Sequence, residues 1–164
     1  MSRAFVKEDA GQPDEDPAER PVSAQPNYVT PRGLKLLRDE EERIVRGLEG
    51  FDGAQTDPAR RRKKRELERD LRYVRARLES ALPVDPAGQP KDQVRFGATV
   101  ALRREDGAEK TVRIVGEDEA EEGGAALSWA APFAQALFGL KAGQSLDWEA
   151  EAGAERWTVS SLSY

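Results

Sequence analysis

The sequence predicts an α+β protein, in which an antiparallel helical hairpin is followed by a small antiparallel sheet with one short helix. Residues 28–83 carry apolar side chains at the three- and four-residue spacing of amphipathic helices, interrupted once by glycines. Residues 93–164 carry apolar side chains at alternate positions, which is the spacing of half-buried strands. A linker at residues 84–92 separates the two patterns. An acidic, proline-rich tail at residues 1–27 precedes them, and its composition predicts disorder.

The first helix is expected to begin after Thr30, because threonine is a favourable N-cap and Pro31 suits the first helical position. Glycines at positions 50 and 53 predict its end. The apolar stripe predicted to face the second helix consists of Leu34, Leu37, Ile44 and Leu48, widened by Leu36 and Val45.

The second helix is expected to begin after Asp57 and Pro58, again a cap followed by proline. Its stripe consists of Leu67, Leu71, Val74, Leu78 and Leu82, and prolines at 83 and 86 stop it. Two helices with such stripes and a short glycine-containing link predict an antiparallel hairpin, a short coiled coil.

The C-terminal strands are predicted at residues 94–103, 110–116, 125–130, 146–150 and 156–164, with a short helix at 132–139. A bulge is expected at Ser160 and Ser161, where the alternation of apolar and polar residues is interrupted.

The composition excludes several classes of protein. The chain has no Cys and no His, which removes disulfides, thiolate nucleophiles, histidine-based triads and most zinc sites. No apolar run approaches the ~18 residues that span a bilayer, and the N-terminus has no apolar signal core. We therefore expect a cytoplasmic protein without a membrane segment, catalytic site, cofactor or metal of its own. An acidic run at residues 117–122 is interpreted as solvated charge rather than a divalent-cation site.

One feature stands out against the net charge of −5, namely a run of six consecutive basic residues at the predicted hairpin tip. Cations at a helix N-terminus oppose the helix dipole, so the run favours a polyanionic partner over a merely solvated helix start. Direct nucleic-acid binding competes with this interpretation, but no aromatic residues are interleaved for base stacking. The tip residues singled out are Asp52, Asp57, Arg60, Arg61, Arg62, Lys63, Lys64 and Arg65.

Several motifs together resemble the bacterial GreA/GreB family of transcription factors over residues 27–164. They are "NYVTPRGLKLL", "VDP" after the second helix, "VRFGATVALRREDGAEKTVRIVGEDEA", "LSWAAPFAQALFG" and "AGQSLDW". The resemblance implies a coiled coil followed by a domain with the FK506-binding fold. It also implies docking of that domain at the rim of the RNA polymerase secondary channel, with the coiled coil inserted through the channel. A tip motif of the type G-D-x-S-E-N-A-E-Y then helps to hold a second Mg²⁺ at the polymerase active centre.

This chain departs from that family pattern at two places. The corresponding tip is "GFDGAQTD", residues 50–57, which lacks the closely spaced acidic pair. The docking loop has Ala130 and Ala131 where the family often has Asp and Ser. By resemblance the polymerase-docking residues are Ser128, Trp129, Ala130, Ala131, Pro132 and Phe133.

The residues and the resemblance together predict a monomeric elongation regulator. It would bind RNA polymerase, contact DNA or RNA only within the elongation complex, and not stimulate transcript cleavage. Two alternatives stay open: a binding module akin to the regulators of nucleoside diphosphate kinase, and a cleavage factor with an unconventional tip. A prolyl isomerase is suggested by the fold alone, and a fold does not determine function.

Overall fold

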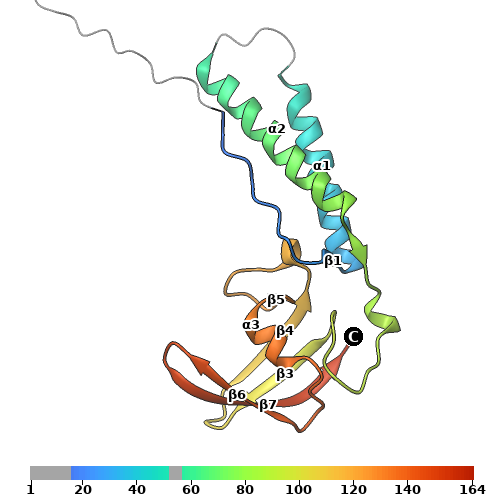
Figure 1. Cartoon of the computed structure of the whole chain (residues 1–164), viewed down its shortest axis with the longest axis vertical. Helices are drawn as coiled ribbons and strands as arrows, with labels where there is room; N and C mark the ends of the chain where they lie inside the picture. The colour runs from blue at the N-terminus through green and yellow to red at the C-terminus, as the bar shows by residue number, and fades with distance from the viewer. Residues whose placement is uncertain (1–15, 52–56) are drawn as a thin grey trace, which may run out of the picture.

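The computed structural model describes residues 16–51 and 57–164, which form a helical hairpin standing on a globular domain (Figure 1). Helix α1 spans Pro31–Glu49 and helix α2 spans Pro58–Glu79. The sheet of the globular domain lies at the opposite end of the molecule from the hairpin tip. No helix in the described part of the chain is long and apolar enough to cross a membrane.

Both helices begin where the local sequence predicts. The Thr30 hydroxyl accepts a hydrogen bond from the Gly33 amide at 2.9 Å, and the Asp57 carboxylate accepts one from the Ala59 amide at 3.0 Å. A proline follows each cap. These side chains satisfy backbone N–H groups that have no partner within the helix.

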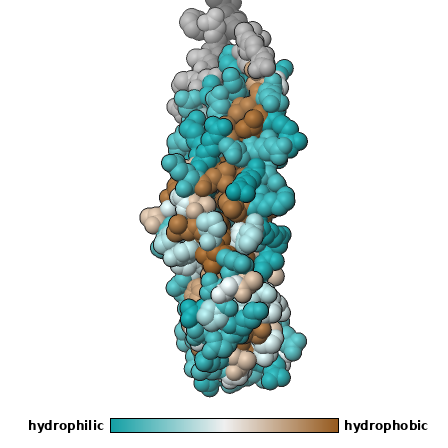
Figure 2. All heavy atoms as spheres, turned by 90° about the vertical axis from the view of Figure 1, so that its right-hand side faces the viewer, coloured by the Kyte–Doolittle hydropathy of each residue, from teal (hydrophilic) through white to brown (hydrophobic). Residues whose placement is uncertain are grey.

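The hairpin core is a narrow stripe between the two helices. Ile44, Leu67 and Val74 are buried, and a second group of side chains packs around them, namely Leu48, Phe51, Leu71, Tyr73 and Leu78. Leu36, expected to widen the stripe, is 42% exposed, and Leu82 lies beyond α2 and is 48% exposed. A helix with one partner buries only the side chains that face that partner. Figure 2 shows the result on one side of the molecule, where hydrophobic atoms form a broken column along the hairpin within a hydrophilic surface.

The globular domain is built on a five-stranded sheet with the order β5-β4-β3-β7-β6. Its strands are β3 (Thr99–Arg104), β4 (Glu109–Val115), β5 (Ala126–Ser128), β6 (Ser145–Ala150) and β7 (Gly153–Ser163). Three of the four pairings are antiparallel, but β5 runs parallel to β4. The expectation of a purely antiparallel sheet was therefore wrong. The segment between these strands contains the short 3-10 helix η2 (Glu117–Glu119) and returns the chain to Arg113, in the second half of β4, where β5 begins.

Helix α3 (Pro132–Leu137) covers the sheet and places Ala134 and Leu137 in the core. The sheet contributes Val100, Leu102, Val112, Ile114, Trp157 and Val159 to that core. The predicted bulge is confirmed, because Ala101 pairs with Ser161 whereas Leu102 pairs with Val159, which leaves Ser160 as the extra residue.

A two-stranded parallel sheet joins the two parts of the molecule. Strand β1 (Tyr28–Val29) precedes α1 and pairs with β2 (Leu82–Pro83), which follows α2. The short 3-10 helix η1 (Pro86–Gly88) then leads into the globular domain. Residues 16–27, the described part of the acidic tail, run beside α2 towards this junction (Figure 1). A domain boundary at residue 27 remains a prediction.

Candidate functional site

The hairpin tip holds the basic run on the first turns of α2. Arg60 donates to the Gly50 carbonyl at 3.0 Å, and its guanidinium lies 5.5 Å from the centre of the Phe51 ring. This contact links the start of α2 to the end of α1. Asp57 is the N-cap of α2, as the sequence predicts, so its carboxylate is already hydrogen-bonded. Asp52 lies outside the described residues.

The other basic side chains of the run divide between solvent and local partners. Arg62 and Lys63 lie 3.2 Å and 3.8 Å from Glu66, and Lys64 lies 3.8 Å from Glu68. The Arg62 and Lys63 side chains remain 77% and 61% exposed. Exposed pairs at this spacing contribute little and exchange easily with solvent. The positive charges of Arg62 and Lys63 are therefore available to a partner.

The base of the hairpin is fixed by an arginine that sequence reasoning missed. Arg77 of α2 is 1% exposed, and its Nε lies 2.6 Å from Asp118 Oδ2. Its Nη2 donates to Asn27 Oδ1 at 2.7 Å and lies 3.3 Å from Glu117. Asn27 in turn donates to the Arg77 carbonyl at 2.7 Å. One guanidinium thus connects the N-terminal segment, α2 and η2.

Two neighbouring contacts complete this junction. The Tyr73 hydroxyl donates to Asp118 Oδ1 at 2.6 Å, and burial together with this bond raises the pKa of Tyr73 to about 12. The Thr30 hydroxyl donates to the buried Glu119 carboxylate, and Arg113 lies 3.5 Å from the other oxygen of that carboxylate.

The acidic run at residues 117–122 was interpreted as solvated charge, and for its first three members this was wrong. Glu117, Asp118 and Glu119 are paired with side chains of the hairpin and of β4. The signal available in the sequence was Arg77 itself, since it follows Val74 by three positions on a helix and so lies near the buried stripe. Among residues 16–51 and 57–164, no group of three or more acidic side chains is arranged to hold a metal ion.

The predicted docking loop, Ser128 to Phe133, is half-buried rather than free. Trp129 packs edge-on against Tyr28 with ring centres 5.1 Å apart, and Phe133 packs edge-on against Trp148 at the same distance. The Ser128 hydroxyl accepts from the Ala130 amide at 3.2 Å, and Gln135 donates to the Trp129 carbonyl at 2.7 Å. Pro132 is exposed, and Ala130 and Ala131 are partly exposed. The solvent-accessible part of the loop is therefore its middle, which consists of small, uncharged residues.

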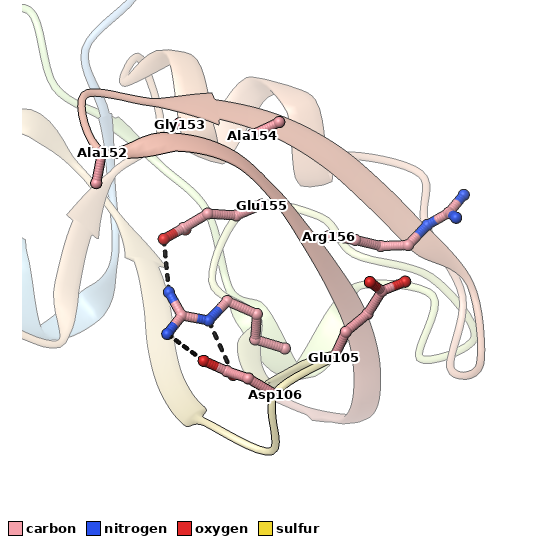
Figure 3. A pocket seen from close by; sticks show the side chains of 8 residues that line it. Glu105, Asp106, Ala152, Gly153, Ala154, Glu155 and Arg156 are labelled. Atoms are coloured by element: carbon pink, nitrogen blue, oxygen red, sulfur yellow. Dashed lines mark hydrogen bonds and ion pairs between the residues drawn. The ribbon is translucent and has the colours of Figure 1, made fainter.

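The far end of the globular domain carries a polar pocket of about 350 Å³ between the β3–β4 and β6–β7 turns. Glu155 and Asp106 both turn towards the Arg104 guanidinium (Figure 3), which donates to them at 2.6 Å and 2.9 Å. Arg104 holds the pKa of Asp106 down to about 2. Arg104, Asp106 and Glu155 thus pair with one another and hold the two turns together.

Comparisons with known proteins agree on one family. The model of the GreA/GreB transcription elongation factor C-terminal domain matches residues 89–164. Transcription elongation factor GreB of Neisseria meningitidis serogroup B is 36% identical over 153 residues, covering 84% of this chain and 94% of that protein. The chain belongs to the GreA/GreB family of transcription elongation factors.

Other members of the GreA/GreB family align over both parts of the molecule. GreA of Desulfovibrio desulfuricans is 30% identical over 152 residues, covering 88% of this chain and 93% of the relative. A solved GreA/GreB structure from Nitrosomonas europaea is 24% identical with a TM-score of 0.43, covering 84% of this chain and 99% of that one. The sequence matches therefore include the hairpin as well as the globular domain.

Proposed function

We propose that this Gre-family protein binds RNA polymerase at the secondary channel and modulates elongation without stimulating transcript cleavage. Family membership supports the polymerase as partner. The hairpin would enter the channel and the globular domain would stay at its rim, with contact to DNA or RNA only inside the elongation complex. The protein would act as a monomer and supply no catalytic site of its own.

The proposal that cleavage is not stimulated rests on the tip. Two-metal hydrolysis needs carboxylates that are free to hold a second Mg²⁺ at the reacting phosphate. Residues 50–57 contain only Asp52 and Asp57 as acids. The Asp57 carboxylate accepts from the Ala59 amide as the N-cap of α2. A ligand role for Asp57 would break this cap, which costs about 1 kcal/mol of helix stability.

The decisive experiment adds the protein to backtracked elongation complexes and follows the length of the transcript with time in Mg²⁺. We expect the transcript to be cleaved at the same rate with the protein as with polymerase alone. Co-purification shows that the protein is bound to the complex. A cleavage-competent GreB serves as the positive control. Mg²⁺-dependent acceleration that Asp52→Asn abolishes, and Asp57→Asn does not, would overturn the proposal and establish an unconventional tip.

The same channel offers acidic polymerase surface and nucleic-acid phosphates to a positively charged hairpin end. The exposed Arg62 and Lys63 side chains suit either kind of anionic target. We propose that the basic run contributes binding energy inside this complex.

A further inference from the structure

The acidic segment at residues 16–20 lies along the flank of α2 and contacts its arginines. Asp16 Oδ1 is 3.3 Å from Arg65 Nε. The Glu19 carboxylate accepts hydrogen bonds from the Arg72 guanidinium, one of them from Nε at 3.4 Å. A pocket of about 210 Å³ lies between these pairs and is lined by residues of both segments. We call residues 16–20 the acidic strap.

Two further contacts hold the acidic strap in place. The Arg20 guanidinium lies 3.8 Å from the centre of the Tyr73 ring, which is within the range of a cation–π interaction, and 3.7 Å from Asp70. Beyond the strap, Asn27 donates to the Arg77 carbonyl at 2.7 Å. The segment is therefore anchored at the junction and runs parallel to α2 towards it.

The spacing of the charges on the strap matches the spacing on the helix. Asp16 and Glu19 are three residues apart, and an extended chain covers about 10 Å in three residues. Arg65 and Arg72 are seven residues apart, which is about 10.5 Å of helix. The two acids of the strap, three positions apart on an extended chain, thus match two arginines that lie two turns apart on one face of α2.

The strap occupies the cations that an external polyanion would use. Hydrogen bonding from Arg72 lowers the pKa of Glu19, so the helix favours the charged form of that carboxyl. The pairs are nevertheless solvent-exposed, with the Asp16 side chain 87% and the Glu19 side chain 63% exposed. Exposed ion pairs are weak and screened by salt, so a competing ligand can displace the strap.

We propose that the acidic strap is a built-in ligand of α2 that competes with free single-stranded nucleic acid for this flank. Single-stranded nucleic acid has the same character as the strap, an extended chain with regularly spaced negative charges. The strap thus lowers the affinity of the hairpin for stray RNA or DNA. This inference concerns the isolated protein and does not depend on polymerase binding.

The test compares Asp16→Asn/Glu19→Gln with the matched control Glu105→Gln/Glu151→Gln. Both double variants remove two negative charges, and the control residues are exposed turn residues of the globular domain. Fluorescence anisotropy with a labelled single-stranded oligonucleotide measures the affinity. Because the exposed pairs of the strap are weak, we expect only about 5-fold tighter binding for the strap variant at low salt. The control should bind like the wild type, and the gain should shrink at ~150 mM salt.

The position of the acidic strap on α2 is tested separately from its effect on oligonucleotide affinity. The chain has no cysteine, so Ala18→Cys gives a single attachment site for a nitroxide. Paramagnetic broadening of the amide signals around Arg72 and Tyr73 is expected, and Asp16→Asn/Glu19→Gln in the labelled protein should weaken it. Equal oligonucleotide affinity for the strap variant and its control, or no broadening on α2, would overturn the proposal. Tighter binding of an acidic peptide but not of the oligonucleotide would also overturn it and indicate a protein partner.

Discussion

Arg77, which is buried, and Asp118, which is half-buried, form an ion pair at 2.6 Å between the hairpin and the globular domain. The pair belongs to a set of contacts that joins three segments: Asn27 before α1, Tyr73 and Arg77 on α2, and Glu117 and Asp118 on η2. Removing one member of such a set leaves buried charges without partners.

Arg77→Met should lower the free energy of unfolding by about 3 kcal/mol, because Asp118 and Asn27 would lose their shared partner in a site with little water. Urea unfolding followed by circular dichroism measures this. Arg75→Met is the matched control, because Arg75 pairs with Glu41 at 2.8 Å on the exposed side of the hairpin. It should cost less than about 1 kcal/mol. Equal costs for the two variants would contradict the structural role given to Arg77.

Tyr73 should make the protein sensitive to alkali. Its pKa is raised from an ordinary 10 to about 12, so the folded state holds the phenolic proton more tightly than the unfolded state. This contribution is complete below pH 10 and is lost as the pH rises through 12. Discounted for solvent screening of the partly exposed side chain, the loss is about 1 kcal/mol by pH 11. The stability difference between wild type and Tyr73→Phe should therefore shrink from pH 9 to pH 11. A constant difference would show that the Tyr73 proton is not linked to folding.

Gly116 is expected to tolerate no side chain, although its backbone conformation is accessible to any residue. A Cβ added there would lie 2.5 Å from the Tyr28 carbonyl oxygen in β1. Gly116→Ala should force β1 and η2 apart and cost about 2 kcal/mol, which is the usual range for overpacking. The control is Gly88→Ala, where an added Cβ meets nothing within 4 Å. Thermal melting of both variants measures the difference, and a neutral Gly116→Ala would contradict the tight junction.

The effect of the predicted docking loop on polymerase binding can be measured separately from its effect on the packing of the globular domain. Phe133→Asp should weaken pulldown of polymerase, but the contact of Phe133 with Trp148 means that it should also lower the melting temperature. Ala130→Glu adds a charge to the partly exposed middle of the loop, so it should weaken pulldown by about 1 kcal/mol without changing the melting temperature. Normal pulldown by a folded Ala130→Glu variant would place the polymerase contact elsewhere.

The basic run should contribute to competition with other secondary-channel factors for polymerase. Replacing Arg61, Arg62, Lys63 and Lys64 with Gln is expected to weaken this competition severalfold. The melting temperature should change little, since the ion pairs that Arg62, Lys63 and Lys64 form with Glu66 and Glu68 are exposed. The control replaces Lys35, Arg38, Arg43 and Arg46, four exposed cations of α1, with Gln. If both quadruple variants compete equally, net charge rather than the tip sets the affinity.

The hairpin could be predicted because its signals are local. Thr30 with Pro31 and Asp57 with Pro58 set the two helix starts within a few residues, and the structure places the caps there. Ser160 was likewise visible as a break in the alternation of β7. The parallel pairing of β5 was not predictable, because alternation indicates a strand but gives no direction for its neighbour.

The junction could not be predicted, because its contacts join residues far apart in the sequence. Arg77 and Asp118 are 41 residues apart, and each alone has the appearance of ordinary surface charge. The exposure of Trp129 similarly depends on Tyr28, about a hundred residues earlier in the chain. Family resemblance predicts a docking loop at Ser128 to Phe133, but only the packing shows that Trp129 and Phe133 are in contact with other aromatic side chains.

The contacts of Arg77 and Gly116 at the base of the hairpin also determine where the hairpin tip lies. Helix α2 has 22 residues and so is about 33 Å long. If a helix of that length tilts as a rigid body about its base, its far end moves by about 6 Å for every 10° of tilt. A displacement of this size is enough to make or break a side-chain contact at the tip. Because Arg77 and Gly116 sit at the pivot, substitutions there would displace the basic run as a whole, with none of its own residues changed.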